Sequence, residues 1–445
     1  MYQGTPLTLR PEAIEAAKTG KRVITEFKRF GERYAWVFYP NGLQVMFEVR
    51  KLPFVHLKIG IRTGAFDDRI AGTAHALEHM LVKDPLLKGD HPAIQGLAPY
   101  GLEVNASTSY DIVDLYGKTS YRKWRQLLSG ILQMVFSAHT IDERRWLVER
   151  PAIEQEIRSV NEIGLLNGAL CTLLHPHVPQ LHHLPFGTHE SILSIRADDL
   201  RERYERDFHP ENAVIIVHGI AEYERFLAEL EGKITTHTPR STISEQARAP
   251  LPLLSKYTNA TLKFKGSPSV ERVVGYTKFV EDPSGTNLEA ARIVLMCMNG
   301  GGILEEALRR KHGWTYSQGA NLETWPMGVV ALNLVARMRS EVHSAATRVL
   351  RNLWRSTCES LGKQDPEHRY TLDRARGAHA LRYMHRGLDR SELSVPFLTY
   401  AWLEQALPKH RAFVDIPPEE FPVIARHAPK LADLEWHMIS VVQDT

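Results

Sequence analysis

The ten-residue stretch Gly72–Leu81, GTAHALEHML, constrains this chain more than any other part of the sequence. It contains His75, Glu78 and His79, and no residue from Ala74 to Lys83 breaks a helix. On an α-helix, residues three and four apart share one face, so these three side chains would converge. Two neutral imidazoles are ligands for a catalytic Zn²⁺ ion that keeps a position open for water. Glu78, beside the ion and not bound to it, would then take a proton from that water.

A second predicted helix offers a third ligand. It is expected to begin near Thr140, which forms a capping box with Glu143, and to continue towards Val160. Glu149 and Glu156 are seven residues apart on this helix, which is about two turns, so they lie on nearly one face. Either carboxylate could complete a zinc site. The competing interpretation is a surface helix that happens to carry two histidines, followed by a helix with solvated carboxylates.

Length and composition favour a globular chain with two domains or more, because 445 residues exceed one ordinary core. The 55 Lys and Arg residues barely outnumber the 52 Asp and Glu residues, which argues against a nucleic-acid partner. No apolar run approaches the length of a membrane span, and the first residues lack the apolar core of a secretory signal. The three widely spaced cysteines fit a reducing compartment. These features predict a cytoplasmic protein without a membrane segment.

Strands and helices in irregular order predict an α+β fold. Alternating residues indicate strands at 43–49, 56–62, 102–109 and 111–116, and helical spacing indicates a core helix at 124–135. After a stretch rich in Thr, Ser and Pro, a strand at 271–279 and an apolar helix at 287–298 begin a second α+β unit, which suggests a diverged duplication. The predicted parts are an N-terminal extension (1–35), a first domain (36–232), a linker (233–261) and a second domain (262–445).

Together these features resemble the pitrilysin/insulinase family of zinc metallopeptidases, the inverzincins. In that family, 76 residues separate the H-x-x-E-H motif from the glutamate that completes the zinc site, and 76 residues separate His79 from Glu156. The family also has a glutamate seven positions before that ligand, where Glu149 stands. The resemblance implies one Zn²⁺ per chain, bound by His75, His79 and Glu156. It makes Glu78 the general base and Glu149 a supporting carboxylate.

Two further segments resemble substrate-binding elements of the family. Residues 102–109, LEVNASTS, look like its N-A-x-T edge strand, where Asn105 and Ala106 hold an extended peptide as an added strand. Residues 308–317 look like its L-R-x-x-x-G-x-x-Y-S segment. There, the resemblance implies that Arg309 and Tyr316 bind substrate and stabilise the scissile carbonyl as it becomes an oxyanion.

The resemblance is to the half-length form of the family, in which two homologous α+β units make one half of a clamshell. Two chains would then enclose a chamber for peptides or unfolded segments, with the zinc site of one chain facing Arg309 and Tyr316 of the other. The expected protein is a zinc endopeptidase that acts as a homodimer. The alternatives are a heterodimer with a related subunit, a processing protease dedicated to one precursor and, ranked lower, a non-catalytic scaffold subunit.

The chain departs from the family pattern at two positions. Ala76 stands where an aromatic residue often follows the first histidine, a change that affects packing and not metal binding. Pro151 lies between Glu149 and Glu156. Inside a helix, proline removes one hydrogen bond and can kink the axis. The sequence therefore leaves the place of Glu149 open.

Overall fold

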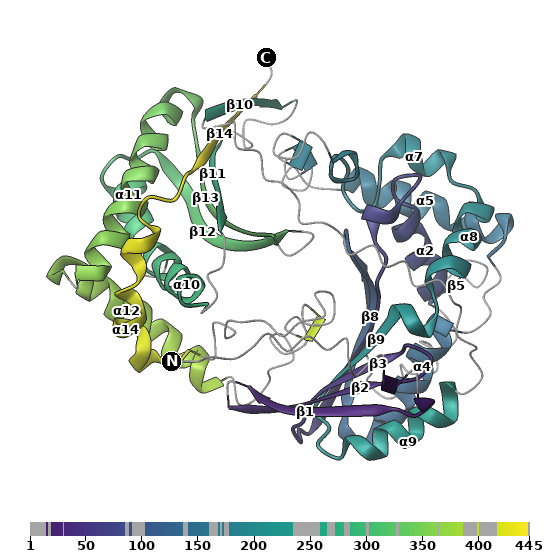
Figure 1. Ribbon diagram of the computed structural model, residues 1–445. Coiled ribbons are helices and arrows are strands. Elements are labelled where there is room, and N and C mark those ends of the chain that lie inside the picture. Colours follow the sequence, from purple (N-terminus) through teal and green to yellow (C-terminus); the bar gives the residue numbers. More distant parts are fainter. Residues whose placement is uncertain are drawn as a thin grey trace. The chain divides into compact units, whose positions relative to one another are not determined.

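The computed structural model describes residues 15–16, 19–29, 31–84, 89–90, 103–136, 141–159, 168–169, 171–172, 178–234, 259–264, 272–279, 285–299, 302–325, 329–363, 365–385, 398–399 and 416–443. Within these ranges the chain forms two compact units (Figure 1). The first unit holds the described residues up to Ile234 together with Leu398 and Thr399, and the second holds the rest. Both units combine helices with a sheet, so the predicted α+β class is confirmed. The boundaries expected at residues 36, 233 and 262 stay predictions.

The first unit is built on a seven-stranded sheet with the strand order β1-β2-β3-β9-β4-β8-β7. β3 and β9 run parallel, and all other neighbouring strands run antiparallel. β7 is an edge strand among the described strands, and β1, which lies in the predicted N-terminal extension, is the opposite edge. The strands are β1 (Val23–Arg29), β2 (Glu32–Phe38), β3 (Gln44–Glu48), β4 (Phe54–Ile61), β7 (Glu103–Thr108), β8 (Val113–Ser120) and β9 (Ala213–His218).

Helices cover one face of this sheet (Figure 1). Side chains alternate between the two faces of a strand, so Leu57 and Ile59 of β4 point to the same face of the sheet. On that face they pack with Leu77 of α2 in the core. The helices predicted around His75 and at 124–135 are confirmed. The helices are α2 (Thr73–Val82), α4 (Trp124–Phe136), α5 (Glu143–Ser159), α7 (His189–Ser194), α8 (Ala197–Asp207) and α9 (Tyr223–Ile234).

The start of α5 is set by Asp142. Its Oδ1 accepts a hydrogen bond of 2.8 Å from the backbone N–H of Arg145, in the manner of an N-cap residue. Thr140, the predicted cap, lies outside the described residues. On the sheet face opposite the helices, Trp36 and Phe38 form a smaller buried cluster that includes Leu398. The first unit thus contains residues from two distant parts of the chain.

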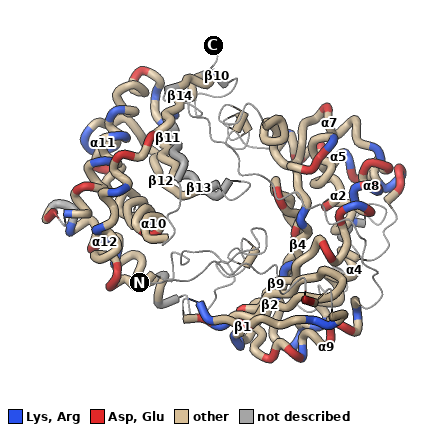
Figure 2. Tube along the Cα trace, viewed as in Figure 1, with Lys and Arg blue, Asp and Glu red and all other residues tan. Residues whose placement is uncertain are grey.

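The second unit has a five-stranded sheet with the strand order β10-β14-β11-β13-β12 and its own buried core. The strand and helix predicted at 271–279 and 287–298 are confirmed as β11 and α10. Acidic and basic residues are interspersed along α8 in the first unit and α11 in the second (Figure 2). No helix in the described part of the chain is both long and apolar enough to cross a membrane. The strands are β10 (Asn259–Phe264), β11 (Arg272–Phe279), β12 (Thr315–Trp325), β13 (Val329–Met338) and β14 (His437–Gln443), and the helices are α10 (Thr286–Asn299), α11 (His343–Lys363), α12 (Pro366–His385) and α14 (Phe421–Ala425).

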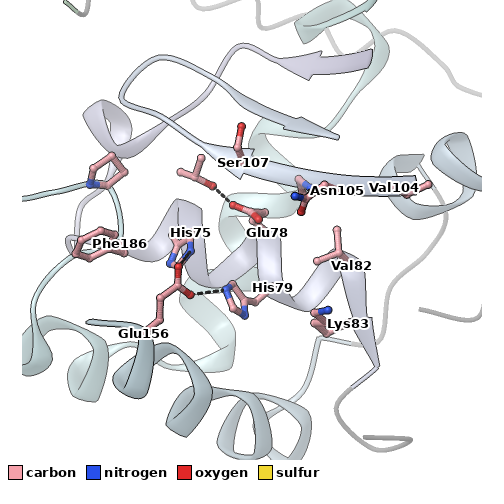
Figure 3. A pocket seen from close by; sticks show the side chains of 13 residues that line it. His75, Glu78, His79, Val82, Lys83, Val104, Asn105, Ser107, Glu156 and Phe186 are labelled. Atoms are coloured by element: carbon pink, nitrogen blue, oxygen red, sulfur yellow. Dashed lines mark hydrogen bonds and ion pairs between the residues drawn. The ribbon is translucent and has the colours of Figure 1, made fainter. Parts of the chain in front are cut away.

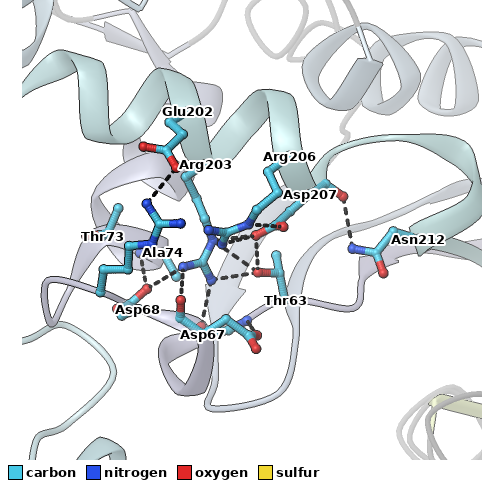
Figure 4. Close-up of polar contacts among 12 residues, drawn as sticks. Thr63, Asp67, Asp68, Thr73, Ala74, Glu202, Arg203, Arg206, Asp207 and Asn212 are labelled. Carbon is cyan, nitrogen blue, oxygen red and sulfur yellow. Dashed lines mark hydrogen bonds and ion pairs between the residues drawn. The ribbon is translucent and has the colours of Figure 1, made fainter. Parts of the chain in front are cut away.

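One buried guanidinium fixes the loop that precedes α2 (Figure 4). Arg203 on α8 is 3% exposed and lies 2.5 Å from Oδ2 of Asp207 and 3.0 Å from Oδ1 of Asp68. It also donates to the carbonyl oxygens of Gly64 and Asp67, each at 2.8 Å. Charge-assisted hydrogen bonds of this kind are shorter and stronger than neutral ones. Arg203 therefore ties the loop after β4 to α8.

Asp68 carries this constraint into α2. Its carboxylate accepts hydrogen bonds from the N–H groups of Gly72, at 2.8 Å, and Ala74, at 3.0 Å. These groups at the helix start have no partner within the helix. Gly72 has φ of 91°, and a Cβ there would lie 2.7 Å from the carbonyl oxygen of Phe186, so this position requires glycine. The start of α2 is thus fixed by Arg203 through Asp68.

We expect Arg203→Met to lower the free energy of unfolding of the first unit by on the order of 3–5 kcal/mol, because it leaves Asp68 buried without its cation. Urea denaturation followed by circular dichroism measures this change. The control is Arg69→Met, which removes an exposed ion pair of 2.7 Å with Glu202 in the same region. That change should cost less than about 1 kcal/mol. Equal effects of the two substitutions would contradict a special role for Arg203.

Candidate metal centre

The structure brings the two histidines of α2 together, as predicted (Figure 3). The ring centroids of His75 and His79 are 4.7 Å apart. Nε2 of His75 lies 3.7 Å from Oε1 of Glu156 on α5, and Nε2 of His79 lies 3.4 Å from Oε2 of the same carboxylate. One donor atom from each of these residues lies within 4.8 Å of the others. This is the one group of side chains among the described residues that could hold a metal ion.

Glu149, whose place the sequence left open, lies on the same side of α5 as Glu156, since both carboxylates contact His79. The helix runs without interruption from Glu143 to Ser159 with Pro151 inside it. Oε1 of Glu149 lies 2.8 Å from Nδ1 of His79. Because an ionised carboxylate only accepts hydrogen bonds, Nδ1 of His79 donates to Glu149, and Nε2 is the ring nitrogen that faces Glu156. A carboxylate in this arrangement orients a metal-binding imidazole.

The donor set fits Zn²⁺, which takes imidazole nitrogens and carboxylate oxygens as ligands. Nε2 of both histidines and one oxygen of Glu156 supply three ligands, the number typical of a catalytic zinc site. The two histidines differ in their second nitrogen. Nδ1 of His79 is bound to Glu149, whereas Nδ1 of His75 is buried and has no hydrogen-bond partner among the residues that the structure describes.

Burial and neighbouring charges shift the pKa values of the two imidazoles in opposite directions. Burial, together with the adjacent His79, lowers the pKa of His75 to about 4. Burial would also lower the pKa of His79, but hydrogen bonds to Glu149 and Glu156 outweigh it and raise that pKa to about 9. The hydrogen bond to His79 lowers the pKa of Glu156, and burial raises the pKa of Glu78. The carboxylates of Glu149 and Glu156 therefore favour a positive charge beside them, at His79.

A cavity of about 500 Å³ in the first unit is lined by His75, Glu78, His79 and Glu156, among others. α2 forms one wall and the edge strand β7 forms another, with Phe186 beside His75 (Figure 3). Asn105 and Ala106, the residues expected to hold a peptide, line this cavity together with Glu78. The predicted metal ligands, base and peptide-binding residues of the first unit thus share one cavity.

Arg309 and Tyr316 lie together in the second unit. The guanidinium carbon of Arg309 is 5.0 Å from the centroid of the Tyr316 ring, within the range of a cation–π contact. Tyr316 is 84% exposed, which leaves its hydroxyl accessible to a ligand. The two side chains are therefore assembled as a pair, as the family pattern implies.

Sequence reasoning missed three residues that support the cluster. Thr108, at the end of β7, donates from Oγ1 to Oε2 of Glu78 at 2.6 Å. The only sequence signal for Thr108 was its place in the N-A-x-T pattern. Arg203 and Asp68, which fix the start of α2, lie 135 positions apart. No local pattern links two residues at that distance, so only the fold reveals their contact.

Comparison with known proteins finds similarity to the family that the sequence motifs resemble. Residues 45–183 match the sequence model of the insulinase family, peptidase family M16. The probable zinc protease PqqL of Escherichia coli (strain K12) is 26% identical over 206 residues, which are 44% of this chain and 22% of that protein. The uncharacterized zinc protease YmxG of Bacillus subtilis (strain 168) is 26% identical over 205 residues, which are 43% of this chain and 49% of that protein.

These matches span half or less of the length of the curated relatives. A solved structure, that of a protease from Helicobacter pylori, has a TM-score of 0.71 at 16% identity and covers 96% of this chain and 100% of that one. This likeness extends the shared fold over both units. The segment matched by the family model includes the helix α2 and both carboxylates of α5 that contact its histidines. Residues 45–183 of the chain are thus similar to the insulinase family of peptidases, family M16.

Proposed function

We propose that this protein is a zinc-dependent endopeptidase that cleaves peptides or unfolded segments bound as an added β-strand. The observation that carries the proposal is the grouping of His75, His79 and Glu156 in one cavity with Glu78, beside the edge strand β7. Two relatives named zinc proteases support it. A non-catalytic scaffold would have no need to keep the ligands and the base together, and we therefore rank it lower.

In this proposal, His75, His79 and Glu156 bind one Zn²⁺ per chain. Bound zinc supplies Lewis acidity, which polarises a carbonyl group and makes water more acidic. Glu149 holds the proton on Nδ1 of His79 and so keeps its Nε2 aimed at the metal site. The carboxylate of Glu78 takes a proton from the attacking water and then delivers it to the leaving nitrogen of the peptide.

The edge strand β7 suits an extended peptide. Its outer N–H and C=O groups are not paired with another described strand, so a substrate can add to the sheet there. The N–H of Ala106 is bound by Oδ1 of its neighbour Asn105 at 2.9 Å, and a peptide carbonyl would replace that oxygen. Recognition through the main chain requires an extended conformation and makes few demands on side chains. Folded proteins are therefore poor substrates in this proposal.

We further propose that two such chains act together, with Arg309 and Tyr316 of one chain serving the zinc site of the other. A guanidinium and a phenol are suitable donors to a developing oxyanion. The family resemblance and the exposed Arg309–Tyr316 pair support this arrangement. A heterodimer with a related subunit would use the same residues. A processing role for one precursor would differ only in the range of substrates, and the cytoplasmic location stays a prediction.

Glu78→Gln tests the base. The variant should keep one zinc per chain and lose activity by about 10²–10⁴-fold, because glutamine cannot accept the proton. Elemental analysis and hydrolysis of an unstructured fluorogenic peptide measure both quantities on the purified chain. A variant as active as the wild type would rule out Glu78 as the base, and absence of zinc from the wild type would favour the scaffold.

Glu149→Gln tests the supporting carboxylate. We expect the dissociation constant for Zn²⁺ to rise about 10- to 100-fold, because the neutral amide holds the Nδ1 proton of His79 less strongly. Competition with a chromophoric chelator gives this constant. The matched control is Glu154→Gln on the same helix, where the carboxylate lies 3.6 Å from Arg150 and 3.8 Å from Arg158. Equal zinc affinity in the two variants would contradict the role of Glu149.

Mixing two inactive variants tests whether the site is shared between chains. Glu78→Gln and Arg309→Ala should each be slow alone, the second by about 10²–10³-fold. In a symmetric dimer, a re-equilibrated 1:1 mixture would regain about a quarter of wild-type activity, since half of the dimers carry one intact site. If Arg309 serves the zinc site of its own chain, mixing restores nothing.

A further inference from the structure

β7 faces α2 with alternate residues. Val104, Ala106 and Thr108 are half-buried, while the two residues between them are exposed, as expected for a strand with one covered face. Val104 and Ala106 pack against the core of the first unit. Thr108 is the polar member of the three, and its Oγ1 donates to Oε2 of Glu78 at 2.6 Å, the contact drawn to Glu78 in Figure 3.

Thr108 is held firmly in this position. Its β-branched side chain has few accessible rotamers. The carbonyl oxygen of the next residue, Ser109, accepts a hydrogen bond of 2.9 Å from the N–H of Ala65. Ala65 belongs to the loop that Arg203 ties to α8. The same loop therefore sets the start of α2 and the end of β7, so it fixes both partners of the Thr108–Glu78 hydrogen bond.

The hydrogen bond suits a carboxylate that must act as a base. Glu78 is only 7% exposed, and a buried carboxylate oxygen requires a hydrogen-bond donor. Thr108 donates to Oε2 alone, which leaves Oε1 available on a side chain that lines the cavity. A valine would suit the strand equally well. Strand propensity therefore does not account for the hydroxyl group of Thr108.

We propose that Thr108 is a positioning residue for Glu78, an inference that rests on the proposed peptidase function. By holding Oε2, it orients Oε1 towards the water that attacks the substrate. Thr108 follows Asn105 and Ala106, the proposed peptide-binding residues, by three and two positions. Thr108 thus sets the position of the base relative to the strand on which the peptide is bound.

The test compares Thr108→Val, which keeps the shape and removes the hydroxyl, with Thr108→Ser, which keeps the hydroxyl. We expect valine to lower kcat about 10- to 100-fold, with KM and zinc content within about twofold of wild type, and serine to restore most of kcat. Thr119→Val is the matched control. Thr119 is a buried threonine on β8 whose Oγ1 has no hydrogen-bond partner in the described part of the chain.

Each outcome supports or contradicts the positioning role of Thr108. Loss of kcat in Thr108→Val alone, with recovery in Thr108→Ser, supports the positioning role. Wild-type kcat in Thr108→Val, no recovery with serine, or an equal loss in Thr119→Val overturns it, as does loss of zinc from Thr108→Val. A wild-type chain that binds no zinc contradicts the proposed function itself, and with it every role assigned to Glu78.

Discussion

The contact between Arg203 and Asp68 is the interaction on which the position of α2 depends. Burying a charge is costly, and such a pair is stable only when the remaining donors and acceptors also find partners. Here, all three guanidinium nitrogens are engaged, and Asp68 uses its oxygens on the first N–H groups of α2. The helix that carries both histidines is therefore oriented by a network at its start. The grouping of His75, His79 and Glu156 thus depends on residues outside that group.

Three elements then meet at the cavity, and each contributes a different chemical group. α2 supplies the imidazoles and the buried carboxylate of Glu78, α5 supplies Glu149 and Glu156, and β7 supplies a strand edge and the hydroxyl of Thr108. Burial and the adjacent His79 lower the pKa of His75 to about 4, whereas hydrogen bonds to Glu149 and Glu156 outweigh burial and raise the pKa of His79 to about 9. The cavity thus combines the proposed metal ligands and the proposed base with the edge of a sheet.

The sequence predicts those parts of the site that follow from periodicity and spacing. His75, Glu78 and His79 converge because helical geometry leaves no alternative once α2 forms. The spacing from His79 to Glu156 needed the family pattern, because no physical rule relates two separate helices. The place of Glu149 could not be predicted, since the effect of Pro151 on α5 depends on packing. Thr108 was missed because its partner comes from another element.

Fold-level features show the same limit. The strands and helices with clear alternation or helical spacing were predicted with small errors at their ends. β1 was missed because its charged residues obscure the alternation in VITEFKR, although Phe27 stacks on Tyr34 of β2 at 5.3 Å. The place of Leu398 against Trp36 could not be predicted either, since local patterns are silent on contacts between residues so distant in the chain.

The hydrogen bond from the N–H of Ala106 to Oδ1 of Asn105 has a consequence for the solubility of the protein. A strand edge left open for ligands is also open to the edges of other sheets, and such edges promote aggregation. Asn105 occupies one donor of this edge with its own side chain, and a rotation of that side chain would release it. A rigid block such as proline would protect the edge permanently and would also close it to peptides. The amide of Asn105 thus makes the protection of β7 reversible.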